Sequence, residues 1–395
     1  MIYCKKCVQP DNRPGIYFNK EGVCGACLYQ EDVEKKINWN KREEELKRIA
    51  EWAKKTAKKN NVSYNCIVGI SGGKDSTFQA LYSRDKLGLK PLLVNCEPEG
   101  ITEIGKKNIE NLKNLGFDTI SIRPNPKVLK KLMKKDFYEF LNPVKVTEFP
   151  LFASSYIVAD QFNIPLVIQG ENPALTLGVR KTGYGVNEDA LNTNKSDTLG
   201  TGWKRYIGDG VTEKDLFWYH YDEKGIRTKG IKAIWLQYYV KEWSQPHNAN
   251  FSIKHGLIIR RNFNPNDIGT YVGYSQLDSD AVQLNQMLKF IKFGFGQCTD
   301  HACYDIREGL ITKKKGIELV KKYDGKCHKK YIKKFCDYIG ISLTEFYKVA
   351  DTFRDTKIWW IKDGQWWKNN IKGGPSTHGK VYLSKKEQVK YKKHG

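Results

Sequence analysis

A short polar segment between an apolar run and a helical pattern constrains this chain most. Residues 65–70 are apolar enough for a buried strand, and a helical pattern starts near residue 74. The segment that joins them is Ser71-Gly72-Gly73-Lys74-Asp75-Ser76. Two glycines let backbone N–H groups approach phosphate oxygens closely, and a helix N-terminus adds its positive dipole. The segment therefore predicts a phosphate-binding loop.

The side chains of this loop have complementary expected roles. The two serines can donate hydrogen bonds to phosphate oxygens, Lys74 supplies a mobile positive charge, and Asp75 can hold Mg²⁺. The loop is not a Walker A loop, because Lys74 is followed by Asp instead of Ser or Thr. A merely solvated glycine turn is the simpler interpretation. Six specified positions between a strand and a helix argue against it.

Apolar runs and helical patterns alternate after the loop. Strand-like runs occur at 91–96, 119–122 and 165–169, and helical patterns at 74–86, 103–115, 127–141 and 150–162. Continuous apolar strands separated by helices predict an α/β fold with a doubly wound parallel sheet. Ligands bind such sheets beyond the carboxyl ends of the strands. The phosphate loop is expected at that edge.

Four cysteines near the start of the chain form two C-x2-C pairs. They are Cys4, Cys7, Cys24 and Cys27. Four thiolates suit tetrahedral Zn²⁺, and a short segment without a core needs such a staple. Because four protein ligands leave no open position, we expect a structural zinc site, with an iron–sulfur cluster as the alternative. A second metal site from Cys298, Cys303 and a histidine is a weaker alternative.

The charge of the chain bears on its partners. The formal net charge is +23, yet only 12 of the 67 basic residues are Arg, and the lysines are spread along the chain. Because recognition of phosphates and bases favours the Arg fork, we expect a solvated basic surface and no specific nucleic-acid partner. No apolar run approaches the roughly 20 residues that span a bilayer. We expect a cytoplasmic protein with no membrane partner.

Composition and periodicity divide the chain into five expected parts. They are a zinc-binding module at 1–40, a phosphate-loop α/β domain at 41–172, a glycine- and aromatic-rich insertion at 173–295 that frames the substrate pocket and continues the core, a helical region at 296–370 and a basic flexible tail at 371–395.

Four stretches together carry a resemblance to a known family. The loop alone resembles the pyrophosphate loop of the adenine-nucleotide α-hydrolase superfamily. Three further stretches are the cysteine opening with Pro10-Asp11, Gly170-Glu171-Asn172-Pro173, and the segment 299–307. With them the chain, from residue 1 to about 355, resembles N-acetyl sugar amidotransferases of O-antigen, pseudaminic-acid and legionaminic-acid pathways. Residues 174–178 depart from the acidic, aromatic run of that family, which bears on the identity of the sugar.

The resemblance implies an ATP-dependent reaction that forms AMP and pyrophosphate. The acetamido oxygen of an N-acetyl sugar attacks the α-phosphorus of ATP, and ammonia then replaces the adenylated oxygen to give an acetamidine. The implied cofactors are ATP, Mg²⁺ and Zn²⁺. The resemblance also implies a separate glutaminase subunit as the nitrogen source. The sequence itself shows no glutaminase signature, and Met1 is followed by Ile2, so we expect no N-terminal cysteine nucleophile.

Polar residues at two strand ends are further candidates. Glu171, assigned a catalytic role, and Asn172, assigned to the substrate, follow the strand 165–169. Glu97 follows the strand 91–96 and is assigned to ATP. A capping glutamate in a turn is the structural alternative for Glu171.

Three residues in the segment 299–307 are the remaining candidates. Asp300 and His301 are expected to form an acid–base pair in which Asp300 sets the tautomer of His301 for proton transfer from nitrogen. Arg307 is expected to pair with a carboxylate or phosphate of the substrate. A structural histidine and a surface arginine are the alternatives.

Two other functions share part of this pattern. A tRNA thiolase combines a pyrophosphate loop with C-x-x-C pairs and a basic surface. It would need a sulfur-handling cysteine pair near the loop or an RNA-binding module, and neither is evident in the sequence. A nucleotide-binding scaffold without catalysis is disfavoured by the intact Lys74, Asp75 and Ser76.

Overall fold

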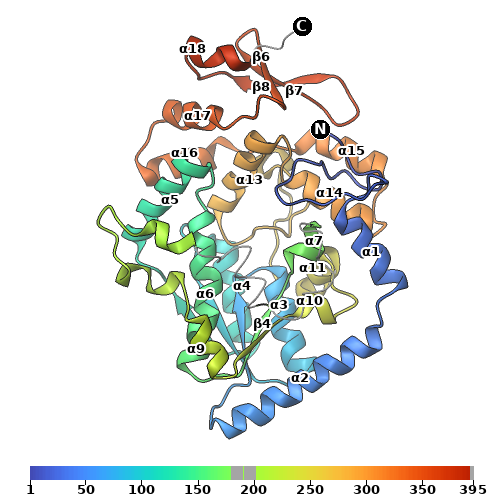
Figure 1. Ribbon diagram of the computed structural model, residues 1–395, viewed down its shortest axis with the longest axis vertical. Coiled ribbons are helices and arrows are strands. Elements are labelled where there is room, and N and C mark those ends of the chain that lie inside the picture. Colours follow the sequence, from blue (N-terminus) through green and yellow to red (C-terminus); the bar gives the residue numbers. More distant parts are fainter. Residues whose placement is uncertain (179–189, 191–201, 392–395) are drawn as a thin grey trace.

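A five-stranded parallel sheet forms the core of the lower half of the protein as drawn in Figure 1. The computed structural model describes residues 1–178, 190 and 202–391. The strand order is β3-β2-β1-β4-β5. The strands span Cys66–Ile70 (β1), Pro91–Cys96 (β2), Thr119–Ile122 (β3), Leu166–Gln169 (β4) and Lys232–Trp235 (β5). All four neighbouring pairs are parallel, which confirms the expected fold class. Only β5 was not expected from the sequence.

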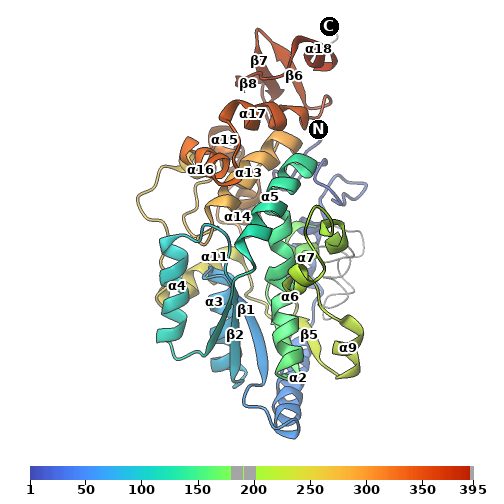
Figure 2. The ribbon, with the colours of Figure 1, turned by 90° about the vertical axis from the view of Figure 1, so that its left-hand side faces the viewer.

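Helices cover both faces of this sheet (Figure 2). One face packs against α2 (Trp39–Lys59), α3 (Lys74–Leu81) and α4 (Glu103–Asn114), and the other against α5 (Pro126–Phe140) and α6 (Lys145–Gln161). Within β1, the side chain of Val68 packs in the core under α2, α3 and α4, and the side chain of Ile67 packs in the core under α5 and α6. Because both faces are buried, the strands are apolar at every position instead of at alternate ones.

The strand order reverses between β1 and β4. Ligands of doubly wound sheets bind where the order reverses, beyond the carboxyl ends of the strands. The phosphate loop follows β1 and the segment starting at Gly170 follows β4. The fold therefore brings two segments a hundred residues apart to the same position at the sheet edge.

The rest of the chain is mainly helical. A π-helical turn, Tyr82–Lys86, extends α3. The later helices are α7 (Pro173–Leu177), η2 (Gly202–Tyr206), η3 (Lys214–Tyr219), α9 (Glu223–Thr228), α10 (Leu236–Tyr239), α11 (Gln245–Lys254), α12 (Pro265–Ile268), α13 (Asp280–Phe293), α14 (Gln297–Arg307), α15 (Lys313–Tyr323), α16 (Lys329–Ile339) and α17 (Leu343–Thr352). Of the insertion expected at 173–295, residues 179–189 and 191–201 lie outside the described part.

The cysteine-rich N-terminus docks on helices from the far end of the sequence. Its four cysteines and the start of α1 (Gly25–Lys35) share an apolar cluster with Ala302 and Cys303 of α14 and with Ile317 of α15. Figure 1 shows the N-terminal segment beside these two helices. The module thus packs against distant segments of the chain as well as around its own cysteines.

The C-terminal segment corrects the expectation of a flexible tail at 371–395. Strands β6 (Trp359–Lys362), β7 (Gln365–Asn369) and β8 (Pro375–Lys380) form an antiparallel sheet, followed by α18 (Lys385–Gln388) and η4 (Val389–Tyr391). Tyr391 is buried and its ring lies edge-on to Trp366, at 4.7 Å between centroids. The lysines and glycines of this segment obscured the few apolar residues that hold it. Residues 392–395 lie outside the described part.

Within the described part of the chain, no helix is both long and apolar enough to cross a membrane.

Candidate active site

The phosphate loop has the backbone that its glycines predicted. Gly73 is the N-cap of α3, so the N–H groups of the first turn point toward the loop. Gly72 has φ +77°, and a Cβ there would lie 2.8 Å from the backbone oxygen of Gly105. Both facts exclude other residues at this position without strain. The Ser76 hydroxyl donates to the backbone oxygen of Gly73 at 3.1 Å, which closes the turn.

Helix α11 fixes the charged residues of the loop. The Asp75 carboxylate accepts from Lys74 Nζ at 2.7 Å and from Asn248 Nδ2 at 2.8 Å. One turn later, the Ser252 hydroxyl donates to the backbone oxygen of Lys74 at 2.7 Å. Both α11 residues are fully buried. Sequence reasoning missed them, because nothing in the pattern of 245–254 indicates that it packs on α3.

We expect Asn248→Ala to weaken Mg²⁺ use, because Asp75 would lose the donor that orients one of its oxygens. Partners of metal-binding carboxylates typically contribute 10- to 100-fold, so we expect a loss of about that size in pyrophosphate release at low Mg²⁺. Titrating Mg²⁺ should restore much of the rate. Asn250→Ala, on the exposed side of the same helix, is the matched control. Equal rates for both variants at every Mg²⁺ concentration would contradict this role.

A cavity of about 400 Å³ opens over the loop. Ligand pockets usually span about 300–1,000 Å³, so a nucleotide or a sugar fits this size class. Its walls include the loop residues Ser71 and Gly73 to Ser76, the segment 274–278, and residues of α13 and α14. Glu171, Asp300 and His301 also line it, so all five residues assigned to catalysis lie in the wall of one cavity.

Asp300 and His301 lie in this wall but do not form the expected pair. Asp300 forms ion pairs with Arg13 and Lys289. His301 Nδ1 lies 2.6 Å from the Thr270 hydroxyl instead. On a helix, consecutive side chains diverge by about 100°, which explains why neighbours in sequence found different partners. The hydrogen-bond partner of His301 Nδ1 is therefore the Thr270 hydroxyl and not the Asp300 carboxylate.

The electrostatics of this wall follow from its burial. Burial disfavours a charged Asp300, yet the cations of Arg13 and Lys289 prevail and lower its pKa to about 2. Burial, reinforced by the positive charges of Lys74 and Lys289, lowers the pKa of His301 to about 3. Asp300 is thus ionised and His301 neutral at pH 7. Sequence reasoning missed Arg13 and Lys289. The sequence offered one indication for Arg13, because a charged residue between two metal-binding cysteine pairs is held in a defined position.

Glu171 lies at the end of β4, where the sequence placed it. Burial, together with the negative charge of Asp75, raises its pKa to about 7. Its Oε2 accepts from Gln245 Nε2 at 3.3 Å. A carboxyl group with a pKa near neutrality can exist in both protonation states under cellular conditions.

Two other strand-end candidates do not line the described cavity wall. Asn172 is fully buried, and its backbone N–H donates to Gln237 Oε1 at 2.7 Å at the start of α7. Glu97 continues the β2 pairing, since its N–H donates to the backbone oxygen of Ile122 at 2.8 Å. Their assignments to substrate and ATP stay predictions.

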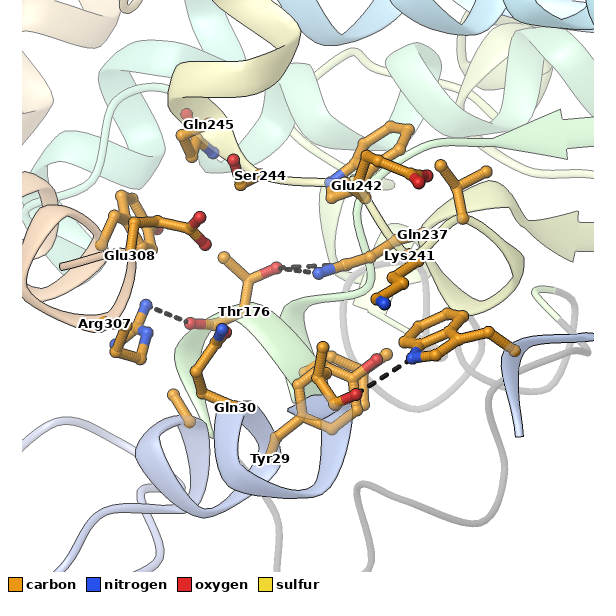
Figure 3. A pocket seen from close by; sticks show the side chains of 17 residues that line it. Tyr29, Gln30, Thr176, Gln237, Lys241, Glu242, Ser244, Gln245, Arg307 and Glu308 are labelled. Carbon is orange, nitrogen blue, oxygen red and sulfur yellow. Dashed lines mark hydrogen bonds between the residues drawn. The ribbon is translucent and has the colours of Figure 1, made fainter. Parts of the chain in front are cut away.

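Arg307 lines a second cavity of about 130 Å³ (Figure 3). Its Nη2 donates to the backbone oxygen of Thr176 at 3.1 Å, and Glu308 lies beside it. This cavity shares Gln245 and Tyr304 with the main one. Arg307 therefore lies at the adjoining cavity, and its expected pairing with a substrate anion stays a prediction.

The four N-terminal cysteines converge as their spacing predicted. Their sulfur atoms all lie within 4.8 Å of one another and all four residues are buried. Backbone N–H groups point at the sulfurs, as from Lys6 and Cys24 to Cys4 Sγ at 3.4 and 3.3 Å. Four buried thiols with N–H donors fit a tetrahedral metal such as zinc. Cys303 packs against this cluster, so it belongs to the module's surroundings and not to a second site.

Comparison with known proteins places one segment of the chain. Residues 266–372 match a family model described as the C-terminal domain of the LPS biosynthesis protein WbpG-like group. This segment is about a quarter of the chain and includes the cavity wall from 274 to 304. A solved structure, NMN synthetase from Francisella tularensis, is 16% identical and covers 57% of this chain and 100% of its own, with a TM-score of 0.28. No curated protein matches.

Proposed function

We propose that this protein is an ATP-dependent amidotransferase that converts the acetamido group of an N-acetyl sugar into an acetamidine for bacterial surface-glycan biosynthesis. One observation carries the proposal. A pyrophosphate-type loop at the switch point of the sheet shares a cavity with a wall built from the segment that matches an LPS-biosynthesis domain. This arrangement supports a reaction in which a nucleotide and a glycan precursor bind side by side.

The proposed chemistry uses the loop for the first step. The acetamido oxygen attacks the α-phosphorus of ATP, the bond to the β-phosphate oxygen breaks, and pyrophosphate leaves. The backbone N–H groups at Gly72 and Gly73 and the Lys74 cation would stabilise the charge on the departing pyrophosphate. Asp75 would hold Mg²⁺, which supplies further charge neutralisation. The protein contributes positioning and electrostatics, since the covalent changes all occur within the substrates.

Ammonia then adds to the activated carbon, a proton leaves the nitrogen, and AMP departs with the oxygen. Neutral His301 has the protonation state that a proton acceptor requires, and it lines the same cavity as the loop. We propose a separate glutaminase subunit as the source of ammonia. The support is the resemblance of the chain to N-acetyl sugar amidotransferases, which implies such a subunit.

The decisive experiment is mass spectrometry of the products. The purified protein is incubated with ATP, Mg²⁺, ammonium and candidate monoacetamido and diacetamido sugars, free and nucleotide-linked. We expect a product lighter by the difference between O and NH, together with AMP and pyrophosphate in equal amounts. ADP and phosphate in place of AMP would refute the mechanism. A tight tRNA complex that survives physiological salt would favour a thiolase instead.

We expect His301→Ala to separate the two steps. Sugar-dependent pyrophosphate release should persist for at least one turnover, whereas amidine formation should fall. General bases contribute about 10²–10⁴-fold, and a pKa near 3 makes this histidine a weak base, so we expect the lower end, about 10². Rapid-quench measurement of both products tests this. Unchanged amidine formation would make the residue structural, and loss of pyrophosphate release would assign it to adenylation.

A further inference from the structure

One part of the main cavity wall consists of uncharged hydrogen-bonding groups. Ser275, Gln276, Gln286 and Gln297 all line the cavity, and the first two lie in the segment between α12 and α13. Amides and hydroxyls pair well with the hydroxyl and acetamido groups of a sugar, whereas phosphates favour cations and N–H cradles. This wall and the phosphate loop thus offer different chemistry to the same cavity.

Two of these glutamines have unmet hydrogen-bonding capacity. The side-chain oxygens of Gln276 and Gln286 are buried and have no partner among the residues that the structure describes. The other two groups bind each other, since Gln297 Nε2 donates to the Ser275 hydroxyl at 3.1 Å. Buried polar atoms in native proteins are nearly always paired, so these two oxygens are available to accept hydrogen bonds from a molecule bound in the cavity. The last torsion of a glutamine rotates freely enough to turn its oxygen toward such a ligand.

The backbone that carries Gln276 is held in place. Gln276 has φ +49°, a left-handed conformation that is costly for a residue other than glycine. The guanidinium of Arg260 donates to the backbone oxygens of both Ser275 and Gln276. Two residues after Gln276, the backbone oxygen of Asp278 accepts a hydrogen bond from the Thr102 N–H at 2.9 Å, which ties the same segment to the start of α4. Strained residues fixed by their surroundings are typical of ligand-binding sites.

Gln286 lies next to the charged groups of the same wall. It is three residues before Lys289 on α13, so the two side chains lie on one face of the helix. Lys289 in turn pairs with Asp300. The amide of Gln286 therefore lies beside this charged cluster and can form hydrogen bonds with a ligand without adding charge.

We propose that Gln276 and Gln286 recognise the acetamido and hydroxyl groups of the sugar, and that Arg260 is a positioning residue that holds Gln276 toward it. The proposal rests on the proposed function and deepens it, because it assigns sugar selection to this wall and nucleotide binding to the loop. The two glutamine oxygens accept from the acetamido N–H or a ring hydroxyl when the sugar is bound.

The test compares sugars with and without the acetamido group. The probes are free and UDP-linked 2-acetamido and 2,3-diacetamido hexoses and the matched hexoses with hydroxyls in those places, measured by saturation-transfer NMR with a nonhydrolysable ATP analogue. Gln286→Met removes the amide at nearly constant shape. Gln276→Asn keeps a residue that tolerates the left-handed conformation but shortens its reach. Asn285→Met, on the same helix but outside the cavity wall, is the control.

We expect the full-length protein to prefer at least one acetamido probe tenfold or more. Each glutamine variant should lose most of that preference and bind the ATP analogue as before, while Asn285→Met keeps the preference. Arg260→Met should raise KM for the sugar more than it lowers kcat. Variants that keep the preference would overturn the proposal and leave the proposed function standing. Glutamine variants that no longer bind the ATP analogue would overturn the proposal by showing that this wall binds the nucleotide. A wild-type protein that binds no acetamido probe would refute both.

Discussion

Lys74→Ala should abolish sugar-dependent pyrophosphate release. Lys74 is the loop's own cation, its side chain is 7% exposed, and it lies at the first position of α3. In the proposed reaction its removal would leave the departing pyrophosphate without the loop's own cation, and it would leave Asn248 as the hydrogen-bond partner of the Asp75 carboxylate. Preorganised charges of this kind contribute about 10²–10³-fold each. We therefore expect a loss of at least 10³-fold when both effects act, measured as pyrophosphate in a single turnover.

Lys86→Ala is the control for this variant. Lys86 is exposed at the end of the π-helical turn that continues α3, so its loss changes the total charge equally without touching the loop. It should behave as wild type. Should Lys74→Ala release pyrophosphate at the control rate, the loop would not be the site of adenylation. A variant with altered circular dichroism would be replaced by Lys74→Met, which keeps the buried stem.

Cys24→Ser should release the metal and detach the N-terminal module. Structural zinc binds zinc-finger peptides with a free energy of about 10–16 kcal/mol, and this binding energy stabilises their folded state. A short segment without a core of its own therefore depends on its metal. We expect one zinc per chain in the wild type and almost none in the variant. The module also supplies Arg13 to Asp300, so the active-site wall should be disturbed as well.

Elemental analysis, limited proteolysis and pyrophosphate release together test this expectation. The variant should lose zinc, become cleavable within residues 1–35 and lose activity. Cys327→Ser, at a partly exposed thiol outside the cluster, should keep all three properties. If protein purified without oxygen shows the absorption of an iron–sulfur cluster, the site holds that cluster and not zinc. A variant that keeps its zinc would show that the remaining thiols suffice.

Local patterns predicted the parts of the site that lie next to each other in sequence. The loop from Ser71 to Ser76 was predictable because a strand, two glycines and a helix start within a few residues define its backbone. The cysteine pairs were predictable for the same reason. The location of Glu171 was predictable because the carboxyl ends of the strands in a doubly wound sheet lie at the edge where ligands bind.

The partners that complete these parts were not predictable. Asn248 reaches Asp75 across 173 residues, and Arg13 reaches Asp300 across 287. Nothing within either local segment indicates such a contact. The same limitation produced the incorrect pairing of Asp300 with His301, because adjacency in sequence was taken for adjacency in space.

The sequence by itself determined the sheet class, the phosphate loop and the thiol cluster, because each depends on residues within one strand, turn or pair of turns. Only the tertiary structure decided which helix faces meet over the loop. It also decided that the N-terminal module supplies Arg13 to the cavity, that Arg307 lines an adjoining cavity, and that the C-terminal segment is folded. These outcomes depend on packing between distant segments, where many weak contacts, and no local pattern, select the arrangement.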